Sequence, residues 1–251
     1  MLPSDVLGSA FAMPWTSPSY PMGPYRFVDR EYLTITYRSD AEILRRLLPE
    51  PLAPIGAEAI VQFIRMPDST GFGDYALVAQ AIPCLLPNGE AGSYVHATYV
   101  NSQTANSAGR ELWGFPQKLA RPSLAVERDT LLGMLDFGPV AVARGSMGFK
   151  HRALPEAEAI AALNAPGVLL KIIPHVDGGP RICELVRYRI SGVALKGAWT
   201  GPASLALMPH ALAPLADLPV LEVLRASHAI ADCTLELGEV IHDYLDEGGA
   251  A

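Results

Sequence analysis

Side-chain amines are scarce in this sequence, so each one is a countable candidate nucleophile. The chain has 251 residues and 19 basic side chains, of which only Lys118, Lys150, Lys171 and Lys196 are lysines. The six histidines lack the i, i+4 spacing of a zinc site and give no reason to propose a metal. The glycine-rich phosphate loops G-x-x-x-x-G-K-[ST] and G-x-G-x-x-G do not occur, and we expect no cofactor.

The composition indicates a folded, globular chain. Half of the residues are hydrophobic and 18% are charged, which excludes a disordered segment. The net charge of −7, without a run of lysine or arginine, disfavours nucleic acid and an anionic membrane surface as partners. Cys84, Cys183 and Cys233 are far apart and form no paired motif, so we expect free thiols in a reducing compartment. The N-terminus lacks a basic region followed by an apolar one, and a cytoplasmic location is predicted.

Strand-like segments of alternating or β-branched residues dominate the chain. They are Tyr32–Tyr37, Ala59–Ile64, Tyr75–Ile82, Ser93–Val100, Leu131–Phe137, Val140–Arg144, Val168–Ile173, Ile182–Ile190 and Val220–Leu237, the last expected to hold more than one strand. Two helices are predicted, Asp40–Leu48 from its aspartate N-cap and Leu154–Leu163 from the proline and acids of its first turn. No linker or repeat divides the sequence. Residues 1–251 are therefore predicted to form one mostly β domain with a few helices (α+β), arranged as a barrel or a sandwich.

One segment carries a specific motif. Residues 109–120 read Gly-Arg-Glu-Leu-Trp-Gly-Phe-Pro-Gln-Lys-Leu-Ala, which resembles the active-site segment of the acetoacetate decarboxylase family. Further matches follow in fixed order along nearly the whole chain, among them Asp68-Ser69-Thr70-Gly71, Gln80-Ala81-Ile82-Pro83, Met147-Gly148-Phe149-Lys150-His151, Lys171-Ile172-Ile173-Pro174 and Ala198-Trp199-Thr200-Gly201-Pro202. So many ordered matches leave little room for coincidence.

The resemblance implies a fold, an assembly and a chemistry. The fold would be an antiparallel β-barrel or sandwich with added helices, assembled as a homo-oligomer. In this family a lysine amine condenses with the ketone of a β-keto acid, and the protonated imine withdraws electrons so that carbon dioxide can leave. The amine must be neutral to attack, so its pKa must fall well below about 10, through desolvation or a neighbouring cation. An arginine holds the substrate carboxylate, and it is retained here as Arg30.

Three reacting positions of the family are changed in this sequence. The family motif has two lysines after the proline and uses the first, but that position is Gln117, whose carboxamide nitrogen is not nucleophilic. The two active-site glutamates of the family correspond to Gln62 and Leu77. Losing the amine alone would leave two carboxylates in an apolar cavity without their counter-charge. The three changes together therefore indicate a site that has been neutralised as a set.

Lys118 is the one candidate stand-in nucleophile. Neighbouring side chains of an extended segment point to opposite faces, so Lys118 should face away from the pocket if Gln117 faces into it. Lys150, within a basic Phe-Lys-His-Arg patch, is expected to pair with acids at the surface or at a subunit contact, and Lys171 and Lys196 are expected to be solvated. The candidate catalytic residues are therefore Lys118 and Arg30, and the candidate substrate-binding residues are Gln117, Gln62, Leu77 and Phe115.

Three functions stay open at this point. The first is a lyase acting on a small β-keto acid or related carbonyl compound, either through Lys118 or without an imine, with Arg30 and amide donors stabilising an enolate. The second is a non-decarboxylating homologue: a small-molecule-binding or repurposed pocket, or a regulatory subunit in the oligomer of an active relative. The third is a structural protein without a ligand, against which the retained Arg30 and the Gly-Phe-Pro turn argue.

Overall fold

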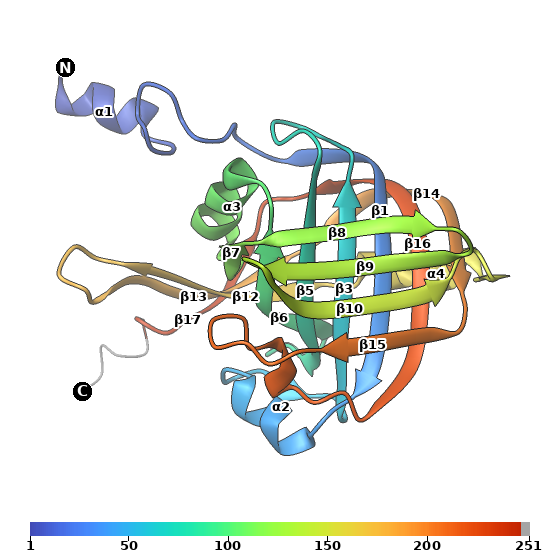
Figure 1. Ribbon diagram of the computed structural model, residues 1–251. Coiled ribbons are helices and arrows are strands. Elements are labelled where there is room, and N and C mark those ends of the chain that lie inside the picture. The colour runs from blue at the N-terminus through green and yellow to red at the C-terminus, as the bar shows by residue number, and fades with distance from the viewer. Residues whose placement is uncertain (247–251) are drawn as a thin grey trace.

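The computed structural model describes residues 1–246, which form two packed β-sheets (Figure 1). The main path of the large sheet runs through β11 (Arg152–Ala153), β14 (Ile190–Thr200), β16 (Glu222–Leu235), β1 (Tyr25–Arg38), β3 (Glu58–Met66), β5 (Tyr75–Leu85), β6 (Ala91–Val100), β12 (Gly167–Pro174), β13 (Pro180–Tyr188) and β17 (Glu239–Asp243). Three short strands branch from this path: β2 (Ala53–Pro54) pairs with β5, β4 (Asp68–Ser69) with β1, and β7 (Gln117–Leu119) with β6. The small sheet has the order β15 (Ala203–Leu207), β10 (Val140–Gly148), β9 (Thr130–Phe137) and β8 (Arg121–Glu127).

This architecture confirms the predicted fold class, mostly β with a few helices. Of the two predicted arrangements the closed barrel is not formed, because within residues 1–246 the large sheet ends at β11 and β17, which do not pair with each other. Pairing is antiparallel except beside β6, which runs parallel to β7 and to β12. These parallel contacts matter for function because one of them positions residue 117.

Four α-helices occur among the described residues: α1 (Pro3–Ser9), α2 (Ala41–Leu47), α3 (Gln103–Ala108) and α4 (Glu156–Asn164). Both predicted helices are therefore present, as α2 and α4, and the carboxylate of Asp40 caps α2 by accepting two backbone hydrogen bonds. Neither α1 nor α3 was predicted. The six residues of α3 carry no apolar period, and its start is fixed by the Ser102 hydroxyl, which accepts a hydrogen bond from the backbone N–H of Ala105.

Two short helical turns complete the description. The π-helical turn η1 (Gly109–Trp113) continues directly from α3, and the 3₁₀ turn η2 (Leu215–Asp217) precedes β16. The prediction of more than one strand within Val220–Leu237 was wrong, since β16 runs unbroken from residue 222 to residue 235. It is continuous because it lies between β14 and β1 and pairs with both.

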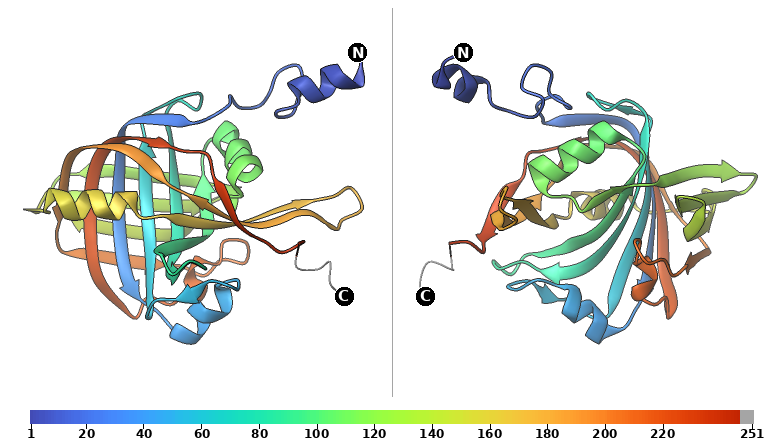
Figure 2. Two further views of the ribbon diagram at one scale, coloured as in Figure 1. Left: turned by 180° about the vertical axis from the view of Figure 1, so that it is seen from behind. Right: turned by 60° about the vertical axis from the view of Figure 1, so that its left-hand side comes forward.

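The large sheet has two buried faces. On one face Leu33 and Ile35 of β1 join the core that is shared with the small sheet. There the ring of Phe63 packs so closely that a Cβ added at Gly133 or Gly145 would lie 2.2 or 2.6 Å from it. On the other face, helix α4 crosses the strands on the side turned away from the small sheet (Figure 2). The alternation of side chains along each strand therefore sends every second residue toward the space beneath α4.

Two segments project from the sheets. Helix α1 lies away from the body of the molecule, and the hairpin of β12 and β13 extends from it on the same side as α3 (Figures 1 and 2). Both expose large apolar side chains, such as Leu7 and Val176. Among residues 1–246, the helices are all too short or too polar to cross a membrane.

Candidate functional site

A cavity of about 410 Å³ lies beneath α4, on the face of the large sheet turned away from the small sheet. Side chains of β1, β3, β5, β6 and β16 form its floor, and α4, the α3–η1 segment and Tyr188 form its walls. Most of the lining is apolar. Small side chains on the floor, such as Ala79, Ala81 and Ala229, leave space above the sheet. Five of the six candidate residues line this cavity: Arg30, Gln62, Leu77, Phe115 and Gln117. Lys118 does not.

Arg30 places a buried positive charge in the cavity. The residue is 8% exposed, and its guanidinium carbon lies 4.7 Å from the ring centroid of Phe27 and 4.9 Å from that of Tyr32. Its Nε and Nη1 atoms are buried and have no hydrogen-bond partner. Within residues 1–246, the titratable groups that act most strongly on its charge are three phenols and one thiol instead of carboxylates: those of Tyr32, Tyr75, Tyr188 and Cys233. Because a guanidinium stays protonated in proteins, the site holds a cation without an acidic partner.

The three tyrosines around Arg30 are neutral hydrogen-bonding groups. Burial raises the pKa of Tyr188 to about 12, although the charge of Arg30 works in the opposite direction. Burial also raises the pKa values of Tyr32 and Tyr75 against the same opposing charge. At neutral pH these phenols can donate hydrogen bonds to a ligand, but they cannot neutralise the arginine. They were not among the predicted site residues, and the alternation Tyr-Leu-Thr-Ile-Thr was the one sequence signal that placed Tyr32 on a common face with Thr34.

Gln117 occupies the wall of the cavity at the start of β7. It is 6% exposed, and its Oε1 atom is buried without a hydrogen-bond partner. The side chain lies against Gly109 of η1, where an added Cβ would be 2.5 Å from Oε1, so a larger residue at 109 would displace it. Its backbone is held by the parallel pairing with Thr98 and by Arg110 Nη1, which donates to the carbonyl oxygen of Gln117 at 3.2 Å. A neutral carboxamide thus stands at the position where the resemblance places an amine.

All four lysines make their contacts outside the cavity lining. Lys118 is exposed, and its Nζ donates to the carbonyl oxygen of Leu212 at 2.8 Å. The Nζ of Lys171 donates to the carbonyl oxygen of Leu112 at 3.1 Å, so it is bound to backbone instead of free in solvent. Two exposed lysines remain: Lys150 lies over the rings of Phe149 and Trp199, and Lys196 forms ion pairs with Asp29 and Asp232. None of these amines stands next to Arg30 in the cavity.

The other candidate residues add polarity but no charge. Gln62 is half-buried on β3, and its Nε2 atom donates to Thr34 Oγ1 on the neighbouring β1 at 3.2 Å. Leu77 on β5 is buried and is paired in register with Ile64. The ring of Phe115 lies 4.9 Å from that of Tyr188 and closes the cavity beside η1. The arrangement can bind an anion at Arg30 and hydrogen-bond neutral oxygen atoms elsewhere, and it offers no nucleophilic amine.

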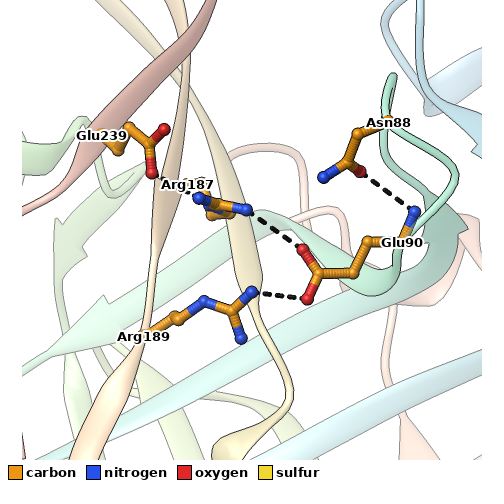
Figure 3. A network of polar contacts seen from close by, with 5 residues as sticks. All are labelled: Asn88, Glu90, Arg187, Arg189 and Glu239. Carbon is orange, nitrogen blue, oxygen red and sulfur yellow. Dashed lines mark hydrogen bonds and ion pairs between the residues drawn. The ribbon is translucent and has the colours of Figure 1, made fainter.

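An ion-pair network holds the outer side of the wall that carries Tyr188. Glu90, in the turn between β5 and β6, accepts from Arg187 Nη1 at 3.1 Å and from Arg189 (Figure 3). Arg187 also pairs with Glu239 of β17. The hydrogen bond from Arg189, together with the charges of both arginines, lowers the pKa of Glu90. The two arginines flank Tyr188, so the network ties the tyrosine's backbone to the β5–β6 turn and to β17.

The side chain of His96 on β6 makes the stability of the protein depend on pH. It lies at a bulge of β6, its Nε2 is buried without a partner, and burial lowers its pKa to about 4. The pKa of an unfolded histidine is near 6.5, so as the pH falls below that value the unfolded state binds a proton before the folded state does. The free energy of unfolding is therefore highest above pH 6.5 and decreases as the pH falls toward the pKa of the folded state. We expect the free energy of unfolding to drop by about 2 kcal/mol between pH 7 and pH 5 from this group, measured by urea denaturation.

The variant His96→Gln should lose that part of the pH dependence. His151→Gln, which removes an exposed ring between β10 and β11, is the matched control and should behave as wild type. Equal slopes for wild type and His96→Gln between pH 7 and pH 5 would contradict the assignment.

The chain has close relatives among known proteins. The family model described as acetoacetate decarboxylase (ADC) matches residues 10–245. A protein of Acidiphilium cryptum named acetoacetate decarboxylase is 60% identical over 237 residues, which is 94% of this chain and 96% of that protein. A solved structure described as "Structural Studies of Acetoacetate Decarboxylase" has a TM-score of 0.94 and 45% identity over 98% of this chain and all of the other. The acetoacetate decarboxylase structure from Legionella pneumophila has a TM-score of 0.90 and 43% identity, with 96% of each chain covered.

These matches span nearly the whole length of both partners, in sequence and in structure. The resemblance drawn from residues 109–120 is therefore confirmed over the full chain, and this protein belongs to the acetoacetate decarboxylase family.

Proposed function

We propose that this protein binds a small keto acid or related carbonyl compound, with the ligand carboxylate at Arg30, and that it does not form the imine used in its family. The observation that carries the proposal is the pair Gln117 and Lys118. The carboxamide lines the cavity, whereas the neighbouring amine is exposed and bonded to a backbone carbonyl.

The buried charge of Arg30 favours a ligand that carries a carboxylate. A buried cation with two unpartnered N–H donors is unfavourable unless an anion compensates it. A carboxylate accepts two parallel hydrogen bonds from a guanidinium, which are among the stronger hydrogen bonds in proteins. A neutral phenol nearby, such as that of Tyr188, can donate a third hydrogen bond to the carboxylate. It carries no negative charge that would itself pair with Arg30. A monocarboxylate therefore matches the site better than a neutral or a cationic compound.

The backbone pairing of β7 with β6 disfavours imine formation through Lys118. For Lys118 to enter the cavity, β7 would have to shift its register with β6 by one residue. That shift would turn Gln117 outward and break the present pairing with β6. That register includes the pairs Thr98 with Gln117 and Tyr99 with Lys118. The other lysines are held by backbone, ring or ion-pair contacts away from the lining.

Decarboxylation without an imine is a second candidate function. It is favoured by the two amides, Gln62 and Gln117, that share the cavity with Arg30, and by the names of the relatives. In this reaction the bond between the α-carbon and the carboxylate breaks, carbon dioxide leaves, and the electron pair forms an enolate. Amide N–H donors would stabilise the enolate oxygen before a proton from water returns to the α-carbon.

The test is incubation with acetoacetate, with and without borohydride. We expect no borohydride-trapped adduct on any lysine by mass spectrometry, and carbon dioxide release no faster than in buffer. An adduct on Lys118 would overturn the exclusion of the imine. Accelerated release of carbon dioxide without an adduct would select the second candidate. The variant Gln117→Lys serves as the positive control for trapping.

A further inference from the structure

Seven cavity residues occupy one row that crosses the large sheet at right angles to its strands. Each is the direct register partner of the next, from β14 through β16, β1, β3, β5 and β6 to β7. In that order they are Thr200, Ser227, Thr34, Gln62, Ala79, Thr98 and Gln117, and all of them line the cavity. Six of the seven carry a neutral hydrogen-bonding side chain.

The neighbouring row on the same face is apolar apart from one phenol. It consists of Ala198, Ala229, Tyr32, Ile64, Leu77 and Val100, again paired strand by strand. Six neutral polar side chains of the cavity floor are thus aligned in one row, while Thr36, Ser93 and Arg225 line the cavity outside it. Buried hydroxyl and amide groups cost free energy unless they find partners, so a line of them is unfavourable in a cavity meant for hydrocarbon alone.

Several groups in the row still have capacity for a ligand. The Thr98 hydroxyl oxygen and Gln117 Oε1 are buried with no hydrogen-bond partner. The pair of Gln62 and Thr34 satisfies one donor and leaves the amide oxygen of Gln62 and the hydroxyl proton of Thr34 to bond elsewhere. Ala79, between them, leaves a gap in the middle of the row where ligand atoms can approach the sheet.

The guanidinium of Arg30 lies close to the row. Arg30 precedes Thr34 by four residues on β1, but its guanidinium carbon is 4.9 Å from the ring centroid of Tyr32, which belongs to the neighbouring row. The cavity volume of about 410 Å³ falls in the range of pockets that enclose molecules much larger than a four-carbon keto acid.

We infer that the ligand is an elongated carboxylic acid bearing a second, uncharged oxygen function, a ketone or hydroxyl, which hydrogen-bonds to the polar row while the carboxylate lies at Arg30. This inference rests on the proposed function and narrows its ligand class. The row itself carries no charge, so the second function is neutral. The apolar row beside it favours an otherwise hydrocarbon body.

The experiment compares matched acids by isothermal titration calorimetry on the full chain. The probes are hexanoate against 5-oxohexanoate, and octanoate against 7-oxooctanoate, each pair differing in one ketone. We expect one oxo acid or both to bind about fivefold or more tightly than the plain acid of equal length, as a net hydrogen bond allows. The variant Thr98→Val, which removes one hydroxyl at nearly constant volume, should reduce that ratio toward one.

Thr98→Val is a suitable probe because the hydroxyl oxygen it removes has no partner in the protein. Its unfolding midpoint should be equal to or above that of wild type, so a lost preference would reflect binding and not misfolding. Thr234→Val is the matched control, because Thr234 lies on β16 outside the cavity lining and should leave the ratio unchanged.

The outcomes separate the two proposals. Equal binding of plain and oxo acids, with both weakened by Arg30→Met, overturns the role of the polar row and leaves the carboxylate site standing. An oxo preference that survives Thr98→Val, Thr34→Val and Gln117→Leu also overturns it. Failure of all four acids to bind overturns the carboxylate site itself.

Discussion

The triple variant Gln117→Lys, Gln62→Glu, Leu77→Glu should decarboxylate acetoacetate on the order of 100-fold or more faster than wild type, because covalent catalysis divides one difficult step into two easier ones. The three positions already line one cavity with Arg30. An amine at position 117 would be buried beside Gly109 and share the cavity with that arginine. Desolvation and the nearby cation both lower an amine pKa, so a useful neutral fraction would exist at pH 7.

The two carboxylates complete the change. In the wild type the positive charge of Arg30 is buried in the cavity, and an added amine alone would place a further basic group in the same cavity. Glutamates at 62 and 77 supply the opposite charge and a group that can carry protons between imine and water. The single variant Gln117→Lys should therefore trap an adduct with borohydride but turn over more slowly than the triple variant. A wild type as fast as the triple variant would show that the native site does not need these groups.

The variant Arg30→Met should move stability and binding in opposite directions. Without ligand, the buried cation of Arg30 has ring contacts but no hydrogen-bond partner at Nε and Nη1, so an apolar side chain of similar length should raise the free energy of unfolding by at least about 1 kcal/mol. Carboxylate affinity should fall on the order of 100-fold, since two charge-assisted hydrogen bonds are lost. Both signs follow from the same observation, namely that Nε and Nη1 of Arg30 have no partner in the protein.

Urea denaturation gives the first quantity and calorimetry with 5-oxohexanoate gives the second. Arg30→Lys is the matched control: it keeps the charge and loses the planar fork, so binding should weaken while the unliganded protein gains no stability. A destabilised Arg30→Met protein would mean that the guanidinium is compensated within the chain and that the argument for an anionic ligand fails.

The fold class and much of the site could be predicted from the sequence, for different reasons. The strands followed from alternation, and Asp40 marked the start of α2 because its N-cap chemistry is local. The five predicted residues that line the cavity came from the resemblance of residues 109–120 and their flanks, not from periodicity. Both faces of β1 are largely buried, so alternation could not say which face held the site.

The features of the site that could not be predicted from the sequence depend on the register between strands that are far apart in the chain. That Ser227 lies beside Thr34, and Thr200 beside Ser227, follows from pairing segments far apart in sequence, and a shift of one residue would have sent each side chain to the other face. Tyr75 of β5 and Tyr188 of β13 act electrostatically on Arg30 of β1, although the three residues are far apart in the sequence. The π-helical turn η1 has no sequence signal that distinguishes it from a continuation of α3.

The position of β16 has a consequence for how the protein is made. This strand covers the edge of β1, yet residues 222–235 leave the ribosome long after residues 25–38. At a synthesis rate of ~5–20 residues per second, the edge of β1 stays unpaired for roughly 10 to 40 seconds before β16 is made. An unpaired strand edge is a template for wrong association, so the nascent chain is most vulnerable in this interval. Slower translation of residues 40–220 would lengthen it and should raise the demand for chaperones, although the finished molecule would be the same.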